Sequence, residues 1–142
     1  MTLPELPSFV RGRTDVDGYQ LYRMSGPGSG KTVGCVVLVT IETDDEATAR
    51  AWVDSVFVAL ASEPNPHPGG ISAAFHIRAD GRQVINYAEW VSAEDHVDAL
   101  GGTGGVGSQT ADWRRVQNFP GARGVGVERY QPPLAQVHAE VE

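Results

Sequence analysis

The pattern of apolar and polar residues divides the chain into strand-like and helix-like segments. Residues 33–41 are apolar at nearly every position, which is typical of a strand covered on both faces. Apolar residues then recur at helical spacing between residues 49 and 60, behind a Thr43 and Glu46 pair that has the spacing of a capping box. The run NPHPGG, residues 65–70, ends this helix because it combines prolines with glycines.

The other segments complete a short list of elements. Residues 18–24 and 124–132 alternate like strands, and residues 71–91 predict two strands joined at Asp80 and Gly81. Ser92 has the position of a cap for a short helix over residues 93–100, and residues 110–119 predict a third helix. The resulting order, β-β-α-β-β-α-α-β, predicts an α+β fold, a ferredoxin-like sandwich with an antiparallel sheet and one extra strand at the front.

The segments at the two ends of the chain lack this periodicity. Residues 1–17 predict an N-terminal arm over the surface, residues 18–132 one ferredoxin-like domain, and residues 133–142 a C-terminal tail. The glycine-rich run at 101–108 predicts a flexible connection, either a lid or a plain loop.

The length of the turn at Asp80 and Gly81 decides which side chains share a sheet face, because a shift of one residue moves a whole strand to the other face. A two-residue turn pairs Phe75 with Asn86 and separates His76 from Asn86. A three-residue turn that includes Ala79 pairs His76 with Val84 instead. We prefer the three-residue turn because it gives one almost continuously apolar face and one mixed face, formed by Ser72, Ala74, His76, Val84, Asn86, Ala88 and Trp90.

On this interpretation the mixed face is the floor of a pocket. Ala74 and Ala88 leave space between the three hydrogen-bonding side chains of His76, Asn86 and Trp90. The alternative is that these three are ordinary core residues whose polar atoms are satisfied by the backbone.

Composition narrows the classes of function. The net charge is −7 with scattered basic residues, which gives no electrostatic support to a nucleic-acid or anionic-membrane partner. Cys35 is the single cysteine, which excludes an intrachain disulfide and a cysteine-rich metal site. No apolar run approaches membrane length and the first residues lack a signal pattern, so we expect a cytoplasmic protein.

The stretch SGPGSGKT, residues 25–32, resembles a phosphate-binding loop in Gly30, Lys31 and Thr32 but has Ser25 where the leading glycine belongs. A working loop of this kind opens directly into a helix. Here the strand-like segment 33–41 follows, so we expect a glycine-rich connection and no nucleotide site.

The segment AAFHIRADGRQVINYAEW, residues 73–90, together with the short helix after it, resembles the central motif of the antibiotic biosynthesis monooxygenase family. This resemblance implies a dimeric α+β barrel, in which two ferredoxin-like sheets face each other and a pocket lies between each sheet and its helices. The apolar face would then meet the second subunit of a homodimer.

The resemblance also implies an activity. The best-studied branch of the family oxidises anthrone-like phenols of polyketide origin to quinones with molecular oxygen, with no metal and no other cofactor. Asn86 and Trp90 would hydrogen-bond the substrate or the reduced oxygen, and His76 would orient the substrate or carry a proton. Further substrate contacts are expected from Ser72, Ala74, Ala88, Trp113 and Arg114, with Arg115 as the alternative arginine.

One position departs from the family pattern. His96 stands where similar polyketide monooxygenases carry a tyrosine, and it could act as a base because histidine titrates near neutrality. The same change could instead mark a non-oxidative polyketide cyclase. A heme-degrading monooxygenase and a non-catalytic binder are the remaining alternatives.

Overall fold

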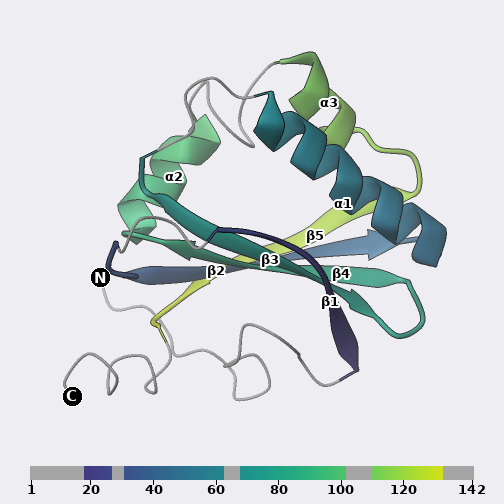
Figure 1. Cartoon of the computed structure of the whole chain (residues 1–142), viewed down its shortest axis with the longest axis horizontal. Coiled ribbons are helices and arrows are strands. Elements are labelled where there is room, and N and C mark those ends of the chain that lie inside the picture. The colour runs from purple at the N-terminus through teal and green to yellow at the C-terminus, as the bar shows by residue number, and fades with distance from the viewer. Residues whose placement is uncertain (1–17, 27–30, 63–67, 102–109, 133–142) are drawn as a thin grey trace.

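A computed structural model describes residues 18–26, 31–62, 68–101 and 110–132. Its element order is the predicted one, β-β-α-β-β-α-α-β (Figure 1). The elements are β1 (Tyr19–Ser25), β2 (Cys35–Thr43), α1 (Glu46–Ala61), β3 (Gly70–Arg78), β4 (Gln83–Trp90), α2 (Ala93–Gly101), α3 (Ala111–Gln117) and β5 (Ala122–Tyr130).

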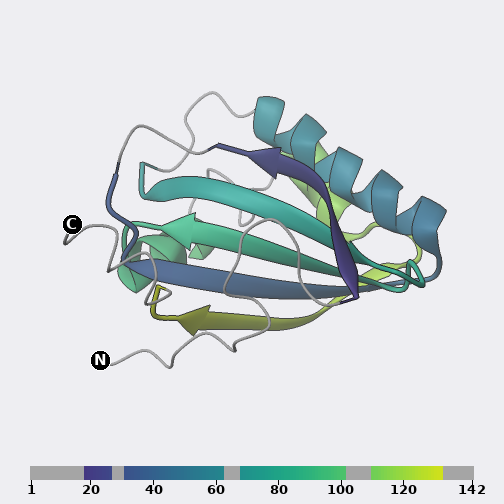
Figure 2. The ribbon, with the colours of Figure 1, turned by 60° about the horizontal axis from the view of Figure 1, so that its bottom comes forward.

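The strands form one antiparallel sheet in the order β1-β3-β4-β2-β5, which Figure 2 shows side by side. All three helices lie on the same side of this sheet (Figure 1). The helices α1 and α3 pack together over one end, and α2 lies over the other. The predicted α+β, ferredoxin-like fold is confirmed, and β1 is the extra strand at the edge beside β3.

The hairpin between β3 and β4 turns as predicted at Gly81 but is one residue longer than predicted. Gly81 has φ of +73°, a left-handed conformation that glycine adopts without strain, and its N–H donates to the Arg78 carbonyl at 2.8 Å. Asp80 Oδ1 accepts from the Arg82 N–H at 2.9 Å, so Arg82 also belongs to the turn. Four residues, 79–82, therefore separate the strands.

This turn overturns the preferred register. Phe75 pairs with Asn86, and His76 pairs with Ile85. His76 consequently lies on the opposite face of the sheet from Asn86. The physical reason is packing, because Phe75 fits beneath α1 with its ring 6.1 Å from the Trp52 ring and 5.5 Å from the Phe57 ring.

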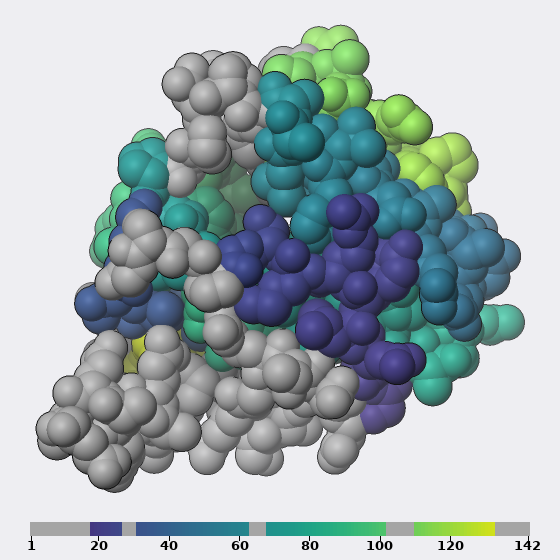
Figure 3. Space-filling model, viewed as in Figure 1, coloured from purple at the N-terminus to yellow at the C-terminus, as the bar shows by residue number. Residues whose placement is uncertain are grey.

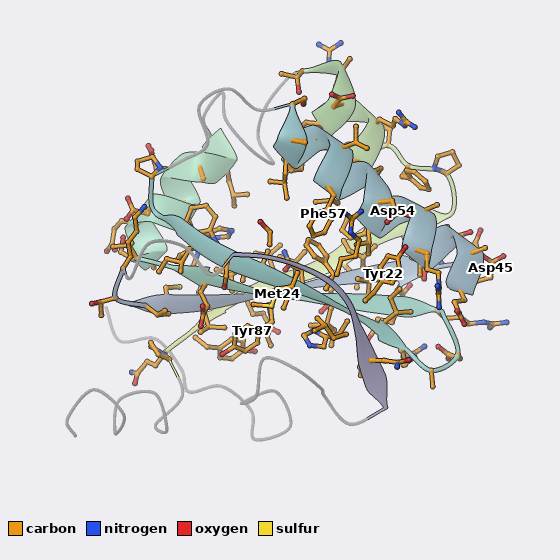
Figure 4. All side chains as sticks on the ribbon, viewed as in Figure 1. Tyr22, Met24, Asp45, Asp54, Phe57 and Tyr87 are labelled. Atoms are coloured by element: carbon orange, nitrogen blue, oxygen red, sulfur yellow. The ribbon has the colours of Figure 1, made fainter. Side chains whose placement is uncertain are left out.

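The two faces therefore differ in content from the prediction. The helix-covered face carries Ala73, Phe75, Ile77, Val84, Asn86, Ala88 and Trp90 from the hairpin, and most of these pack in the core beneath the helices. The helix-free face carries Ser72, Ala74, His76, Ile85, Tyr87 and Glu89. Figure 4 shows Tyr87 on the side of the sheet away from the helices, where it belongs to an apolar cluster with Val36, Leu38 and Ile85.

The helix termini are capped by local side chains. Asp45, not Thr43, is the N-cap of α1 and accepts from the Thr48 N–H at 2.8 Å. The predicted capping box is therefore wrong, because Thr43 Oγ1 donates instead to the carbonyl of Gly81 at 2.6 Å and ties β2 to the hairpin turn. Ser92 caps α2 as predicted, accepting from the Asp95 N–H at 3.0 Å.

The edge strand β1 is held against α1. The Tyr22 hydroxyl donates to Asp54 at 3.0 Å, and the Arg23 guanidinium pairs with the same carboxylate at 3.1 Å while lying over the Phe57 ring. Figure 3 shows the atoms of β1 lying against those of α1, and Figure 4 shows Tyr22 directed at Asp54. Hydrogen-bonded contacts between an extra strand and a helix keep the edge of this sheet in place.

Two sequence expectations concern the start of β2. A strand follows Lys31, not a helix, so the condition for a phosphate-binding loop is not met, although residues 27–30 lie outside the described part of the chain. Cys35 is fully buried, so its thiol packs in the interior. No helix among the described residues is long and apolar enough to cross a membrane.

Candidate functional site

The helices leave one band of their sheet face uncovered. Asn86, Val39 and Val127 lie next to one another across β4, β2 and β5, and we call these three residues the central band. Asn86 and Val39 are half-buried and Val127 is 50% exposed, although the first two are on interior strands. The residues on both sides are buried, with Val84 at 0% and Val37 at 0%. This partial exposure makes the central band a candidate place for a ligand to contact the sheet.

The side-chain oxygen of Asn86 is the polar atom of this band. Its Oδ1 is buried and accepts no hydrogen bond from the described residues. A buried amide oxygen without a partner costs about 1–3 kcal/mol, so such an atom calls for an explanation. A bound hydroxyl group would supply the missing hydrogen bond, while the Nδ2 of the same amide could donate to a carbonyl or an oxyanion.

Trp90 and His96 meet beside the central band. Trp90 ends β4 on the same face as Asn86, and His96 lies in the second turn of α2. Their ring centroids are 5.2 Å apart with an interplanar angle of 63°, an edge-to-face contact. The Ser92 cap fixes where α2 begins, so it also fixes how the imidazole meets the indole.

Arg129 of β5 completes this group. It pairs with Val37 and so faces the helices, and its Nε donates to His96 Nδ1 at 3.0 Å. Burial and then the Arg129 charge lower the pKa of His96 from its ordinary 6.5 to about 4. His96 is therefore neutral at pH 7, with Nδ1 occupied as an acceptor and its proton on Nε2. The expectation that His96 acts as a base near neutrality does not fit this environment.

Comparison with known proteins finds similar monooxygenases. A stretch of 28 residues is 57% identical to tetracenomycin-F1 monooxygenase of Streptomyces glaucescens, covering 20% of this chain and 25% of that protein. The structure is also similar to that of a monooxygenase from the gene ActVA-Orf6 of Streptomyces coelicolor, solved in complex with the ligand nanaomycin D. The TM-score is 0.52 and the identity 27%, over 70% of this chain and 88% of that one.

In these two matches the chain resembles the antibiotic biosynthesis monooxygenase family. Two Listeria monocytogenes structures share its fold at 17% identity and a TM-score of 0.51, each covering 81% of this chain. One is the heme-degrading enzyme LmHde, covered over 71% of its length, and the other a ferredoxin-fold protein related to antibiotic biosynthesis monooxygenases, covered over 64%. No model of a known protein family matches the chain.

The structure divides the predicted site residues between the two faces of the sheet. Asn86, Ala88 and Trp90 lie together on the helix-covered face, and His96 reaches them from α2. The prediction that His76, Ser72 and Ala74 share a face with Asn86 is wrong, because the hairpin register puts all three on the helix-free face. There Ser72 Oγ donates to Glu89 at 2.8 Å, and His76 is fully buried.

The residues predicted on the third helix are also divided. Trp113 is 1% exposed and packs in the core cluster with Trp52 and Val116. Arg114 and Arg115 are exposed on α3. The sequence reasoning missed Arg129, which lies on the helix-covered face. Strand alternation predicts that Arg129 shares a face with Val127, but only the pairing of β5 with β2 shows that this is the helix-covered face.

Two further features lie apart from this group. A half-open groove of about 370 Å³ runs between the start of β1 and the first turns of α1, lined by residues that include Tyr22, Arg50 and Ile77. Among the described residues no cluster of three or more His, Cys, Asp or Glu side chains could hold a metal ion.

Proposed function

We propose that this protein is a cofactor-independent monooxygenase that oxidises an anthrone-like polycyclic phenol to a quinone with molecular oxygen. The observation that carries the proposal is the buried Oδ1 of Asn86, which has no partner among the described residues and lies in the partly exposed central band, with Trp90 and His96 at its edge. The similarity to two Streptomyces monooxygenases supports it.

The proposed reaction balances without another reactant. The methylene carbon of the anthrone loses two hydrogens and gains one oxygen atom as a carbonyl. The second oxygen atom leaves as water, so the four electrons lost by carbon reduce one O₂. The deprotonated phenol is itself the electron donor to oxygen, which leaves the protein to bind the substrate and stabilise its anion.

The residues of the site suit that role. Asn86 would accept a hydrogen bond from a substrate hydroxyl through Oδ1 and donate to the developing oxyanion through Nδ2. His96, neutral and with Nδ1 occupied by Arg129, would donate from Nε2. Donors placed at an oxyanion typically accelerate a reaction about 10²- to 10³-fold. They also lower the pKa of the bound substrate, so its proton can leave to solvent at the half-exposed band without a histidine base.

We further propose that the active form is a cytoplasmic homodimer. The reason is the resemblance of residues 73–90 to a family of dimeric α+β barrels, which implies that the helix-free face, with its apolar cluster of Val36, Leu38, Ile85 and Tyr87, meets a second sheet. The second sheet of an α+β barrel would pack against such a face. Light scattering on purified protein tests this part by giving the molar mass in solution.

Oxygen uptake tests the activity. We expect metal-free protein to consume one O₂ per anthrone oxidised, with the quinone identified by mass. Formation of a cyclised product without oxygen uptake would contradict the oxidation and identify a cyclase. Oxygen uptake only after heme is added would point to heme degradation instead.

A further inference from the structure

Arg129 is a half-buried cation on the face where the substrate would bind. Its backbone pairs with Val37 in the sheet interior, so its side chain leaves β5 toward α2 and not toward the helix-free face. Its charge lies close enough to Cys35 and His96 to act on the pKa of both groups. A guanidinium in such a position loses part of its hydration and requires polar partners.

The described partner of Arg129 is neutral. Its Nε donates to His96 Nδ1, and no described carboxylate forms a salt bridge with the guanidinium. Arg123 on the same strand differs, because it pairs with Glu42 at 3.7 Å and with Asp44 at 3.4 Å. The one arginine of β5 that faces the site is thus the one whose charge no described carboxylate balances.

Glu94 is an acid near this group, but it is not a described partner of Arg129. Glu94, in the first turn of α2, acts on the Cys35 pKa but is itself exposed and solvated. Arg129 therefore retains its positive charge and the N–H groups of its two terminal nitrogens, the fork with which arginine binds a carboxylate or another anionic oxygen.

We propose that Arg129 is a specificity-determining residue that binds an anionic oxygen of the aromatic substrate, with His96 as the positioning residue that fixes its guanidinium. This proposal rests on the proposed function for the identity of the ligand as an anthrone-like aromatic. Two groups share the required chemistry, namely a carboxylate substituent and the phenolate formed on deprotonation.

Equilibrium binding tests whether Arg129 binds a carboxylate substituent, and this measurement does not require catalysis. The probes are anthraquinone-2-carboxylate and anthraquinone-2-carboxamide, followed by quenching of tryptophan fluorescence. We expect the wild type to prefer the carboxylate and Arg129→Gln to lose about 10- to 100-fold in affinity for it, with little change for the carboxamide. Arg129→Lys keeps the charge and should lose less. The matched control, Arg123→Gln, removes a cation from the same strand and should leave both affinities unchanged.

The rate of anthrone oxidation as a function of pH tests whether Arg129 binds the phenolate form of the substrate. If Arg129 binds the phenolate, the apparent pKa of kcat rises in Arg129→Gln, and His96→Phe shifts it in the same direction by a smaller amount. Arg129→Lys again separates loss of charge from loss of folding.

Different results would contradict the proposed oxygenase function and the proposed role of Arg129. Absence of oxygen uptake with a retained carboxylate preference would remove the oxygenase function and leave the anion site. The proposal for Arg129 is overturned if Arg129→Gln leaves both the carboxylate preference and the pH profile of oxidation unchanged.

Discussion

The two halves of the helix-covered sheet face differ in the side chains that they hold. Beneath α1 and α3 the face is filled by large apolar side chains, including Trp52, Phe75 and Trp113, which are 7%, 2% and 1% exposed. Beneath α2 the floor consists of small residues, Cys35, Val37 and Ala88, with polar groups above them. A central band of partly exposed residues separates the two halves.

This difference separates a part of the face that stabilises the fold from a part that holds polar side chains able to contact a substrate. A dense cluster of aromatic and aliphatic side chains stabilises the sheet without any titratable group. The α2 half holds a histidine, an arginine and an indole in contact, which a packed core would exclude unless each polar atom had a partner. Substitutions in the first half should therefore affect stability, and those in the second should affect binding and turnover.

The largest effect is the loss of stability expected when a large side chain is removed from the core beneath α1 and α3. Phe75→Ala removes a ring that contacts Trp52 and Phe57 and should cost about 3–5 kcal/mol in the free energy of unfolding. Urea denaturation followed by circular dichroism measures it. The matched control is Val127→Ala in the half-exposed band, with an expected loss below about 1 kcal/mol. Equal losses would remove the distinction between the two halves.

The next effect concerns the site. Asn86→Ala should reduce kcat about 10²- to 10³-fold and leave stability nearly unchanged, because it removes a buried oxygen that has no described partner. Steady-state oxygen uptake and urea denaturation of the same samples measure both quantities. Asn118→Ala, an exposed amide at the end of α3, serves as control. A loss of stability with unchanged kcat would assign Asn86 to the core.

Stability should also depend on pH through His96. The folded pKa of about 4 lies below the ordinary 6.5, so the unfolded chain binds more protons between these values. Stability is complete above pH 6.5 and falls as the pH decreases, with a linked loss that approaches about 3 kcal/mol at pH 4.

Urea midpoints between pH 7 and pH 4.5 check this dependence. His96→Asn keeps an acceptor for Arg129 but does not titrate, so its midpoints should vary less. This window lies above the acid range of Asp45 and Asp80, whose pKa values are lowered by hydrogen bonds to Thr48 and to Arg78 respectively. An identical slope in wild type and variant would exclude His96 as the cause.

The smallest effect is expected at the edge strand. Tyr22→Phe removes the hydroxyl that donates to Asp54 at 3.0 Å and should cost about 1 kcal/mol. Urea denaturation measures it, and kcat should not change because Tyr22 and Asp54 are not part of the group formed by Asn86, Trp90, His96 and Arg129. In an Asp54→Ala background the same substitution should cost much less. An undiminished cost there would mean that the hydroxyl acts through another contact.

Much of the fold follows from local pattern. The continuous apolar run of β2, the helical spacing in α1 and the glycine at the hairpin turn each act over a few residues, and all three predictions are confirmed. Part of the site could be predicted in the same way, since Asn86 and Trp90 share a strand and therefore a face. The position of Arg129 beside His96 could not, because the two residues are 33 positions apart and lie on different elements.

The sequence by itself determined the order of elements, the left-handed Gly81 and the spacing of Asn86 and Trp90. Only the tertiary structure decided that His76 lies on the opposite face of the sheet from Asn86 and Trp90. An Asp-Gly pair suits turns of several lengths, so local preference does not select the register, and a change of one residue reverses a whole strand. The packing of Phe75 beneath α1 made that selection, and the same packing left the α2 half of the face to Trp90, His96 and Arg129.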